Sequence, residues 1–281
     1  MDGILLINKP KGITSFDVIR KLRKILNTTK IGHSGTLDPF AEGLLVVLVG
    51  RATKLSNMLM SQNKTYEGTL SFGKHYDTYD YTGEILKEDN KVISLSDLEG
   101  IKGAFLGTYM QTPPIYSAIK KDGKKLYEYA RSGIDVKLEQ RMVTINSLEF
   151  NSLSENSFKF ITNVSSGTYI RSLAVDLATS LNTYGYLASL KRVSSGSFNL
   201  RDSYLIEEVN ENSLITISDY FKDSPKVVLS DYLIKLVRNG IRLDDRQIVT
   251  NEIFKVYDEF NNLVAIYEPV GINEYKPLIL L

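Results

Sequence analysis

The chain has 281 residues, with 34 Lys and Arg against 33 Asp and Glu, so its net charge is +1. This length can bury a hydrophobic core, but a near-neutral chain has no bulk attraction for polyanions. The absence of cysteine excludes disulfides, thiolate nucleophiles and cysteine-ligated metals, and two histidines are too few for a histidine-rich metal centre. We therefore expect no tightly bound metal.

The N-terminus runs into the apolar residues 4–7 without a basic region or a cleavage site, which predicts a first strand and no signal peptide. No apolar segment approaches membrane-spanning length, because the run at residues 44–49 is bounded by Gly43 and Gly50. These features predict a soluble, cytoplasmic protein.

Helices and strands follow in an α+β pattern. Ser15 can cap a helix whose apolar residues up to Leu26 share one face, and residues 43–49 form a continuous apolar run, typical of a strand covered on both faces. A short amphipathic helix is expected around residues 55–59. The alternation over residues 64–72 then predicts a strand, followed by a polar connection over residues 73–83.

The second half contains a break, a strand pair and a helix. Thr112-Pro113-Pro114 interrupts a predicted helical stretch, residues 143–150 and 158–164 read as paired strands, and a helix from about Thr168 carries Arg171 in its first turn. Residues 115–141 are rich in lysine and tyrosine, and we expect an insertion that reaches for a ligand.

From about residue 225 the sequence changes to short strands, at residues 226–229, 254–257 and 263–267, with a short helix to Arg238 among them. This predicts a small β-rich C-terminal domain over residues 225–281, after a larger domain over residues 1–224.

The most informative segment is GHSGTLDP at residues 32–39. Pro39 restricts Asp38 to extended geometry, and the neighbouring glycines permit tight turns, so the loop can present one acid to a bulky ligand. Residues 1–60 also carry nine Lys or Arg against four acids. Taken alone, an Asp-Pro turn and a basic surface are equally ordinary features of soluble proteins.

Several motifs in a fixed order resemble the bacterial tRNA pseudouridine synthase B family, whose members isomerise uridine 55 of the tRNA T-loop. The resemblance covers about residues 3–200 and is weaker beyond them. Its motifs are NKPKGITS at 8–15, GHSGTLDP at 32–39, GRATK at 50–54, KTY at 64–66, QTPPIYSAIK at 111–120, GTYIR at 167–171 and LKR at 190–192.

The resemblance implies a pseudouridine synthase fold: a mixed, antiparallel-rich sheet flanked by helices, an RNA-gripping insertion at about residues 115–141 and a small PUA-like C-terminal domain. It implies that Asp38 is the catalytic aspartate, acting either as a nucleophile at C1′ or in deprotonation of the sugar. Arg171 would pair with Asp38, and Tyr66 would stack on the base and take its C5 proton. The isomerisation needs no cofactor.

The same resemblance implies the substrate-binding residues. His33 would fill the space left by the flipped uridine, and the insertion would contact RNA through four side chains, which are Tyr116, Lys120, Tyr127 and Arg131. The motifs add Lys9, Asp77, Tyr169 and Leu190 to the substrate-binding set. The chain departs from the family pattern at Ser166, where members often have lysine, and at Tyr76, where they often have a small polar residue.

Three functions stay open on the sequence. The main hypothesis is a stand-alone enzyme, a monomer that binds the tRNA T-arm and needs no protein partner. The alternatives are a guide-RNA-dependent pseudouridine synthase and a non-catalytic RNA-binding protein that helps tRNA to fold. The joint presence of Asp38, Tyr66 and Arg171 favours an enzyme.

Overall fold

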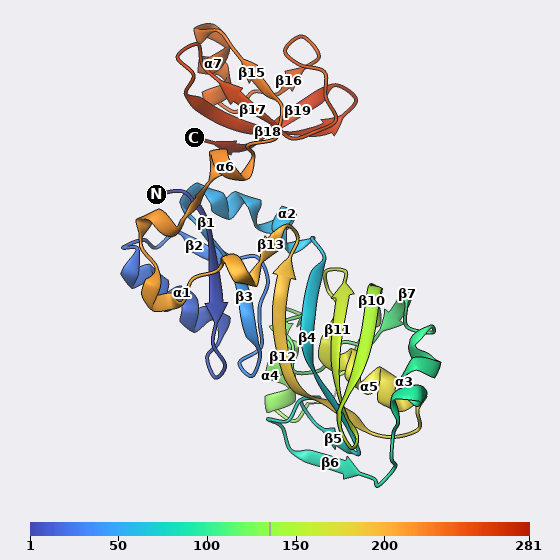
Figure 1. Cartoon of the computed structure of the whole chain (residues 1–281). Helices are drawn as coiled ribbons and strands as arrows, with labels where there is room; N and C mark the ends of the chain where they lie inside the picture. The colour runs from blue at the N-terminus through green and yellow to red at the C-terminus, as the bar shows by residue number, and fades with distance from the viewer. Residues whose placement is uncertain (135) are drawn as a thin grey trace.

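The computed structural model describes residues 1–134 and 136–281, and Asp135, inside the predicted insertion, lies outside the described residues. A long, curled ten-stranded sheet forms the body of the molecule, and a separate five-stranded sheet lies at one end (Figure 1). The strands of the large sheet are β1 (Gly3–Lys9), β2 (Ile31–His33), β3 (Glu42–Val49), β4 (Lys64–Phe72), β7 (Gly107–Gln111), β10 (Arg141–Ser154), β11 (Ser157–Val164), β12 (Gly185–Ser195), β13 (Phe198–Asn199) and β14 (Ile215–Thr216).

Helices are short and are distributed along the sheet. The α-helices of the body are α1 (Ser15–Ile25), α2 (Ser56–Met60), α3 (Leu95–Lys102), α4 (Leu126–Arg131), α5 (Ile170–Ser180) and α6 (Ile217–Tyr220). Short 3₁₀ helices are η1 (Gly50–Leu55), η2 (Leu200–Asp202), η3 (Ile206–Glu208) and η4 (Glu211–Ser213). A two-stranded ribbon of β5 (Lys74–Tyr76) and β6 (Ile85–Glu88) lies beside the body.

The order of the large sheet is β14-β1-β3-β12-β4-β11-β10-β7, with β2 on β3 and β13 on β12. Among the described strands of this sheet, β3 and β12 form the one parallel pair, over Glu42 with Lys191 and Gly43 with Arg192. The mixed, antiparallel-rich sheet is therefore confirmed. The parallel contact joins two strands that are distant in the chain, and it connects the two halves of the sheet.

Gly43 lies at this junction with a φ of 102°. A Cβ on Gly43 would come within 2.4 Å of the Arg192 carbonyl oxygen. Only glycine satisfies both the backbone conformation and the close approach.

Helix α1 covers one face of β1 and β3 because apolar residues alternate along both strands. Leu5, Ile7 and Val47 point to α1 and pack on its Val18 and Leu22. The opposite face is covered by η1 and by the C-terminal sheet, with Ile4, Leu48 and Ile266 in one cluster. The prediction that residues 43–49 are buried on both faces is confirmed.

The predicted cap of α1 was wrong by one residue. Thr14 is the N-cap: its Oγ1 accepts a hydrogen bond from the Asp17 amide at 3.0 Å, and the Asp17 carboxylate accepts one from the Thr14 amide at 2.9 Å. This is a capping box. Ser15 is buried and turns inward instead, so its hydroxyl is free for another partner.

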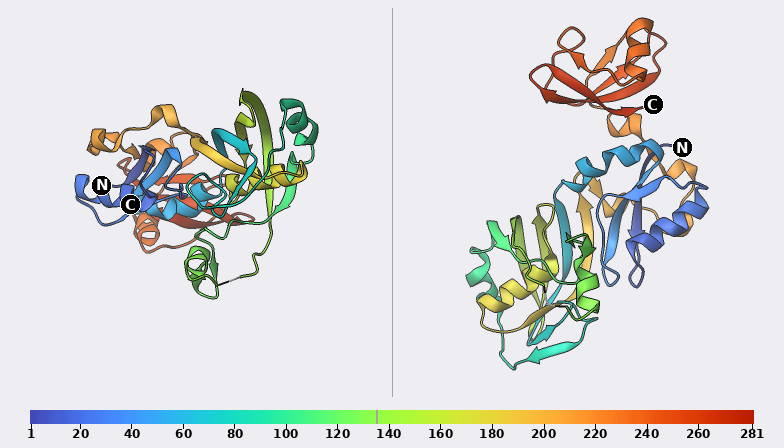
Figure 2. Two further views of the ribbon diagram at one scale, coloured as in Figure 1. Left: turned by 90° about the horizontal axis from the view of Figure 1, so that it is seen from below. Right: turned by 180° about the vertical axis from the view of Figure 1, so that it is seen from behind.

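The predicted insertion begins after Pro114 and contains a hairpin and a helix. Strands β8 (Lys120–Lys121) and β9 (Lys124–Lys125) are joined by Asp122 and Gly123, whose φ angles are 49° and 82°. Positive φ at both positions is the geometry of a type I′ turn. Helix α4 follows and projects from the body in the view from below (Figure 2, left).

The C-terminal sheet has the order β15-β17-β18-β19-β16 and its own core around Phe254, Tyr267 and Tyr275. Its elements are β15 (Lys226–Val228), α7 (Asp231–Arg238), β16 (Leu243–Asp244), β17 (Phe254–Tyr257), β18 (Leu263–Gly271) and β19 (Glu274–Leu280). The predicted short strands and helix of this segment are confirmed, and β16 and β19 are additional.

One further prediction needs correction. The segment before Thr112 is strand β7, which pairs antiparallel with β10, and not a helical stretch. Edge pairing with a long neighbouring strand decides its conformation, which local sequence does not show. No helix in residues 1–134 and 136–281 is both long and apolar enough to span a membrane.

Replacing Gly43 by alanine tests the junction. We expect Gly43→Ala to lower the free energy of unfolding by at least about 2 kcal/mol, because a strained φ and a backbone clash coincide there. Urea denaturation measures this. Gly100→Ala is the control, since nothing lies within 4 Å of its added Cβ. That helical substitution should stabilise by roughly 0.5–1 kcal/mol, and equal effects of the two variants would contradict the prediction.

Candidate active site

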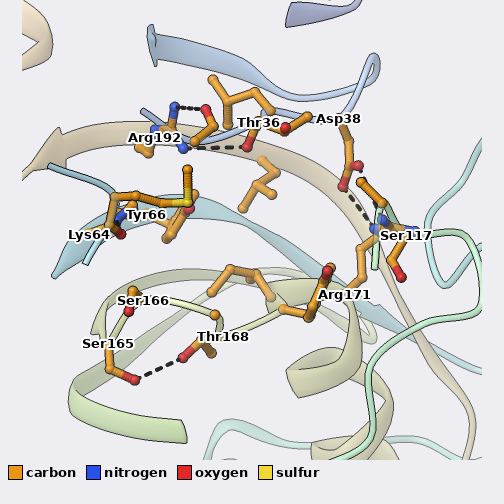
Figure 3. A pocket seen from close by; sticks show the side chains of 18 of the residues that line it. Thr36, Asp38, Lys64, Tyr66, Ser117, Ser165, Ser166, Thr168, Arg171 and Arg192 are labelled. Atoms are coloured by element: carbon orange, nitrogen blue, oxygen red, sulfur yellow. Dashed lines mark hydrogen bonds and ion pairs between the residues drawn. The ribbon is translucent and has the colours of Figure 1, made fainter. Parts of the chain in front are cut away.

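A cavity of about 540 Å³ opens beside strands β12 and β4. The loop around Asp38, strand β4, strand β12 and the start of α5 each contribute to its wall. Figure 3 shows Asp38, Arg171 and Ser117 on one side of the cavity and Lys64 and Arg192 on the other. Ser165, Ser166 and Thr168 lie along the lower wall in this view.

The Asp38 loop is held from behind by the start of α1. The Leu37 amide donates to Ser15 Oγ at 2.9 Å, and this hydroxyl donates to the Leu37 carbonyl at 3.1 Å. The Gly12 amide donates to the Pro39 carbonyl at 2.8 Å. Leu37 and Phe40 are buried on either side of the aspartate. These contacts leave the Asp38 carboxylate as the side chain that the loop presents to the cavity.

Arg171 meets Asp38 through two nitrogens. Its Nη2 donates to Asp38 Oδ1 at 3.1 Å, and its Nε lies 2.9 Å from Asp38 Oδ2 as an ion pair without hydrogen-bond alignment. The Arg171 side chain is 4% exposed, whereas that of Asp38 is 35% exposed. The guanidinium is thus fixed in the wall, and the carboxylate keeps a face open to the cavity.

Three further groups hold the guanidinium. Nη1 donates to the Thr78 carbonyl at 2.9 Å and lies 4.0 Å from Asp80 Oδ2, and Nη2 also donates to the Tyr116 carbonyl at 2.9 Å. Asp80 is itself fixed by the Thr82 amide and hydroxyl. Arg171 is the centre of a network that joins the Asp38 loop, the 78–82 turn and the root of the insertion.

Burial raises the pKa of the Asp38 carboxyl above its ordinary value. The Arg171 guanidinium opposes this rise, and the neighbouring Asp80 carboxylate adds to it. Arg171 therefore favours the ionised form of Asp38 against its surroundings.

Tyr66, Tyr169 and Leu190 also line the cavity. Tyr66 lies on β4 opposite Arg192 of β12 in the sheet register. The backbone of Tyr169 is clamped by Gln111, which accepts from the Tyr169 amide at 2.8 Å and donates to its carbonyl at 3.1 Å. Burial raises the pKa of the Tyr169 hydroxyl. The structure brings these three predicted residues together with Asp38 and Arg171.

Lys64 and Arg192 are buried cations whose hydrogen bonds go to carbonyl oxygens. Lys64 Nζ donates to the Met60 and Gln62 carbonyls at 2.8 and 2.6 Å. Arg192 donates to the carbonyls of Leu44, Gly35 and Thr36 at 2.7, 3.1 and 3.5 Å. Neither has a carboxylate within 4.0 Å among the described residues. Burial, with Arg192 nearby, lowers the pKa of Lys64 to about 8.

Lys9 and His33 are among the predicted binding residues that do not line the cavity. Lys9 is 0% exposed, and its Nζ donates to the carbonyls of Pro10 and Ile13 at 3.0 and 2.8 Å. Burial lowers its pKa to about 8. His33 accepts from the Gly35 amide through Nδ1 at 3.3 Å, and burial, with Arg192 nearby, lowers its pKa. The geometry of Lys9 indicates a residue that positions the 10–13 turn, instead of the predicted direct contact with substrate.

The predicted insertion residues fall into two groups. Tyr116 donates through its hydroxyl to Asp77 Oδ2 at 3.0 Å, so both predicted residues belong to the network around Arg171. Lys120, Tyr127 and Arg131 lie further out on the insertion. The Arg131 guanidinium lies over the Tyr127 ring, 5.5 Å from its centre.

Sequence reasoning missed several residues of the site. Asp80, Lys64, Arg192 and Ser117 were not among its candidates. Lys64 and Arg192 belong to motifs that were recognised, KTY and LKR, and their burial was the missing information. Asp80 has no local signal, because its importance comes from contact with Arg171. Ser166 lies in the cavity wall, and Tyr76 packs on Tyr186 with ring centres 4.7 Å apart.

The described residues hold no cluster of three or more His, Asp or Glu that could bind a metal ion. The cavity therefore offers a carboxylate, cations and hydroxyl groups as its chemical groups. A carboxylate that is paired with an arginine on one side and exposed to the cavity on the other can act as a nucleophile or a base.

Comparison with known proteins identifies relatives over the whole chain. Residues 23–170 match the family described as TruB family pseudouridylate synthase, N-terminal domain. A protein of Acholeplasma laidlawii named tRNA pseudouridine synthase B is 46% identical over 98% of each chain. Proteins with the same name from Onion yellows phytoplasma and Bacillus cytotoxicus are 44% and 40% identical, over at least 97% of each chain.

Solved structures with a similar fold include an H/ACA RNP bound to a substrate RNA, with a TM-score of 0.71 and 20% identity over 99% of this chain and 85% of the other. A Cbf5-Nop10-Gar1 complex gives 0.70 and 22%, over 96% and 79%. At this identity the likeness concerns the fold, and it agrees with the predicted pseudouridine synthase fold.

The lowered pKa of Lys64 predicts a pH dependence of stability. The unfolded chain binds this proton up to its ordinary pKa of 10.5, whereas the folded chain loses it at about 8. Stability therefore rises with pH between these values. Relative to Lys64→Met, the native chain should gain about 2 kcal/mol in free energy of unfolding from pH 8 to pH 10. Urea denaturation at each pH measures the difference, and a flat difference would contradict the prediction.

Proposed function

The chain belongs to the TruB family of pseudouridylate synthases, and on this premise we propose that its Asp38 cavity isomerises uridine 55 of the tRNA T-loop to pseudouridine. The chain is an isomerase that modifies tRNA, as its 40–46% identical relatives over nearly the full length indicate. The observation that carries the assignment of the cavity is the Asp38 carboxylate, paired with a buried arginine and open on its other side.

The reaction exchanges one glycosidic bond for another and moves one proton. The bond between N1 and C1′ breaks, the uracil turns, C5 joins C1′, and the C5 proton leaves while N1 gains one. No electron is gained or lost overall, so the residues of the cavity suffice without a cofactor. The Asp38 carboxylate can attack C1′ or take a proton from the sugar, and both routes need it ionised.

Arg171 keeps Asp38 ionised and aimed. A guanidinium stays charged in a buried site and can hold both carboxylate oxygens, which a lysine cannot do with the same geometry. Tyr66 stacks on the uracil and accepts the C5 proton in the last step. Both roles require the uridine to leave its base stack, because C1′ and C5 are unreachable within it. Tyr169 and Leu190 form further walls of the cavity around the flipped nucleotide. His33 fills the space that the flipped uridine leaves in the T-loop.

The insertion binds the RNA around the flipped uridine. Lys120 and Arg131 are exposed cations, and Tyr127 supplies an aromatic face, which suits a folded RNA loop. The insertion therefore recognises the shape of the RNA loop. Tyr116 and Asp77 join this segment to Arg171.

The enzyme acts as a monomer, without guide RNA or protein partner. Residues 1–224 form the catalytic domain, with the insertion at about 115–141, and residues 225–281 form a PUA-like domain. The separate core of the C-terminal sheet supports this division.

Removing the carboxylate tests the proposed function. We expect Asp38→Asn to reduce tritium release from C5-labelled tRNA transcript by at least about 10³-fold, with no metal or guide RNA added. Asp176→Asn is the control, because Asp176 is a partly buried aspartate of α5 that contacts Tyr109 outside the cavity. Binding of tRNA without release by the native chain would instead favour a guided enzyme or a tRNA-folding protein.

The pH profile tests the role of Arg171. Asp38 is active when ionised, so kcat/KM should fall at low pH as the Asp38 carboxylate gains a proton. The raised pKa of Asp38 sets the position of this acid limb of the profile. Arg171 opposes that rise, so Arg171→Lys should move the acid limb to higher pH and lower the plateau by about 10²-fold. Single-turnover rates from pH 5 to pH 9 measure both effects. An acid limb that stays in place would show that another group controls it.

A further inference from the structure

The outer face of α1 is an exposed basic surface that the cavity does not use. Phe16, Arg20, Arg23 and Lys24 are all exposed on this helix. Phe16, Arg20 and Arg23 follow one another at spacings of four and three residues, so they form a stripe along one side of the helix. None of these residues lines the cavity.

The charge of this surface is almost entirely positive. Residues 11–30 include six Lys or Arg and a single acid, Asp17. Asp17 pairs with Arg20 at 2.6 Å and caps the helix, so it offsets one cation. The whole chain has a net charge of only +1. A local excess of this size in a nearly neutral protein creates an attractive field for a polyanion at one place.

Phe16 is 61% exposed, although its helix has a well-packed apolar side. The Arg23 guanidinium lies 5.9 Å from the centre of its ring. An aromatic face next to cations is a suitable platform for a nucleotide, because the ring can stack on a base while the cations meet phosphates. Folding alone gives no reason for a phenylalanine in this position.

The stripe begins beside the catalytic loop. Ser15, the residue before Phe16, holds Leu37 by two hydrogen bonds, and Leu37 precedes Asp38. Arg23 lies eight residues along the helix from Ser15, about 12 Å away at the rise of an α-helix. The stripe thus starts one residue from a side chain that holds the Asp38 loop.

This surface and the insertion lie on opposite sides of the Asp38–Arg171 pair. Helix α1 supports Asp38 from behind, whereas the root of the insertion contacts Arg171. The view from behind in Figure 2 shows α1 and α4 on either side of the loops between them. If the insertion holds the T-arm, the RNA that reaches α1 belongs to a different segment.

We propose that the stripe of Phe16, Arg20 and Arg23, with Lys24, binds the backbone of the tRNA outside the T-arm. This rests on the proposed function and extends it from a loop enzyme to one that also reads the folded tRNA. The surface contributes affinity and salt dependence, and no step of the chemistry.

The test compares two substrates, full-length tRNA transcript and an isolated T-arm hairpin, with the native chain and Arg23→Glu. The variant should bind full-length tRNA about tenfold more weakly. The plot of the logarithm of the association constant against the logarithm of the salt concentration should become less steep by about 1. Its affinity for the hairpin and its single-turnover rate on the hairpin should stay unchanged. Phe16→Ala should weaken the binding of full-length tRNA but not of the hairpin, and it should leave the salt slope unchanged because phenylalanine carries no charge.

Lys102→Glu is the control for a charge reversal far from α1, although Lys102, unlike Arg23, is half-buried and pairs with Glu99. Lys102 also lies in the last turn of a helix with a capping box, α3, at the far end of the large sheet from α1 (Figure 1). It should leave both substrates unaffected. Unchanged binding of full-length tRNA by Arg23→Glu would overturn the proposal, and equal weakening of both substrates would place the surface against the T-arm instead. The unchanged hairpin rate separates these outcomes from failure of the proposed catalytic function.

Discussion

The close backbone approach of Gly43 to Arg192 is the constraint on which the site depends. It joins β3 to β12 in parallel, so the loop before β3 and the middle of β12 lie at one place. Asp38 comes from that loop, Arg192 from β12, and Tyr66 from the next strand, β4. A larger side chain at residue 43 would separate the strands and, with them, the groups of the cavity.

The polar partners in the cavity are distributed unequally. Arg171 faces two carboxylates, whereas among residues 1–134 and 136–281 the partners of Lys64 and Arg192 are carbonyl oxygens. Carbonyls satisfy the hydrogen-bonding groups of a cation without cancelling its charge. One side of the cavity therefore keeps a positive potential, which suits a substrate that carries phosphates, although the chain as a whole is almost neutral.

Much of this architecture could be predicted from the sequence, because it depends on local patterns. The apolar run before Gly50, the alternation along β4 and the position of Arg171 in α5 all follow from periodicity. The pairing of Asp38 with Arg171 was expected only through the family resemblance. Strand β7 and the contact of Asp80 with Arg171 could not be predicted, since both depend on segments distant in the chain. The burial of Lys9 could not be predicted either. Its motif was recognised, but burial decides whether a lysine contacts the substrate or the turn that follows it in the chain.

Tyr116 gives the insertion a mechanical connection to the chemistry. Its carbonyl accepts from Arg171 and its hydroxyl donates to Asp77, so a shift of the root of the insertion would disturb the Asp38–Arg171 pair. If the insertion binds RNA as proposed, the energy gained from contacts far from the uridine can be used to align the reacting groups, and does not appear only as tighter binding. A substrate that lacks those distant contacts would then be turned over more slowly even at saturation.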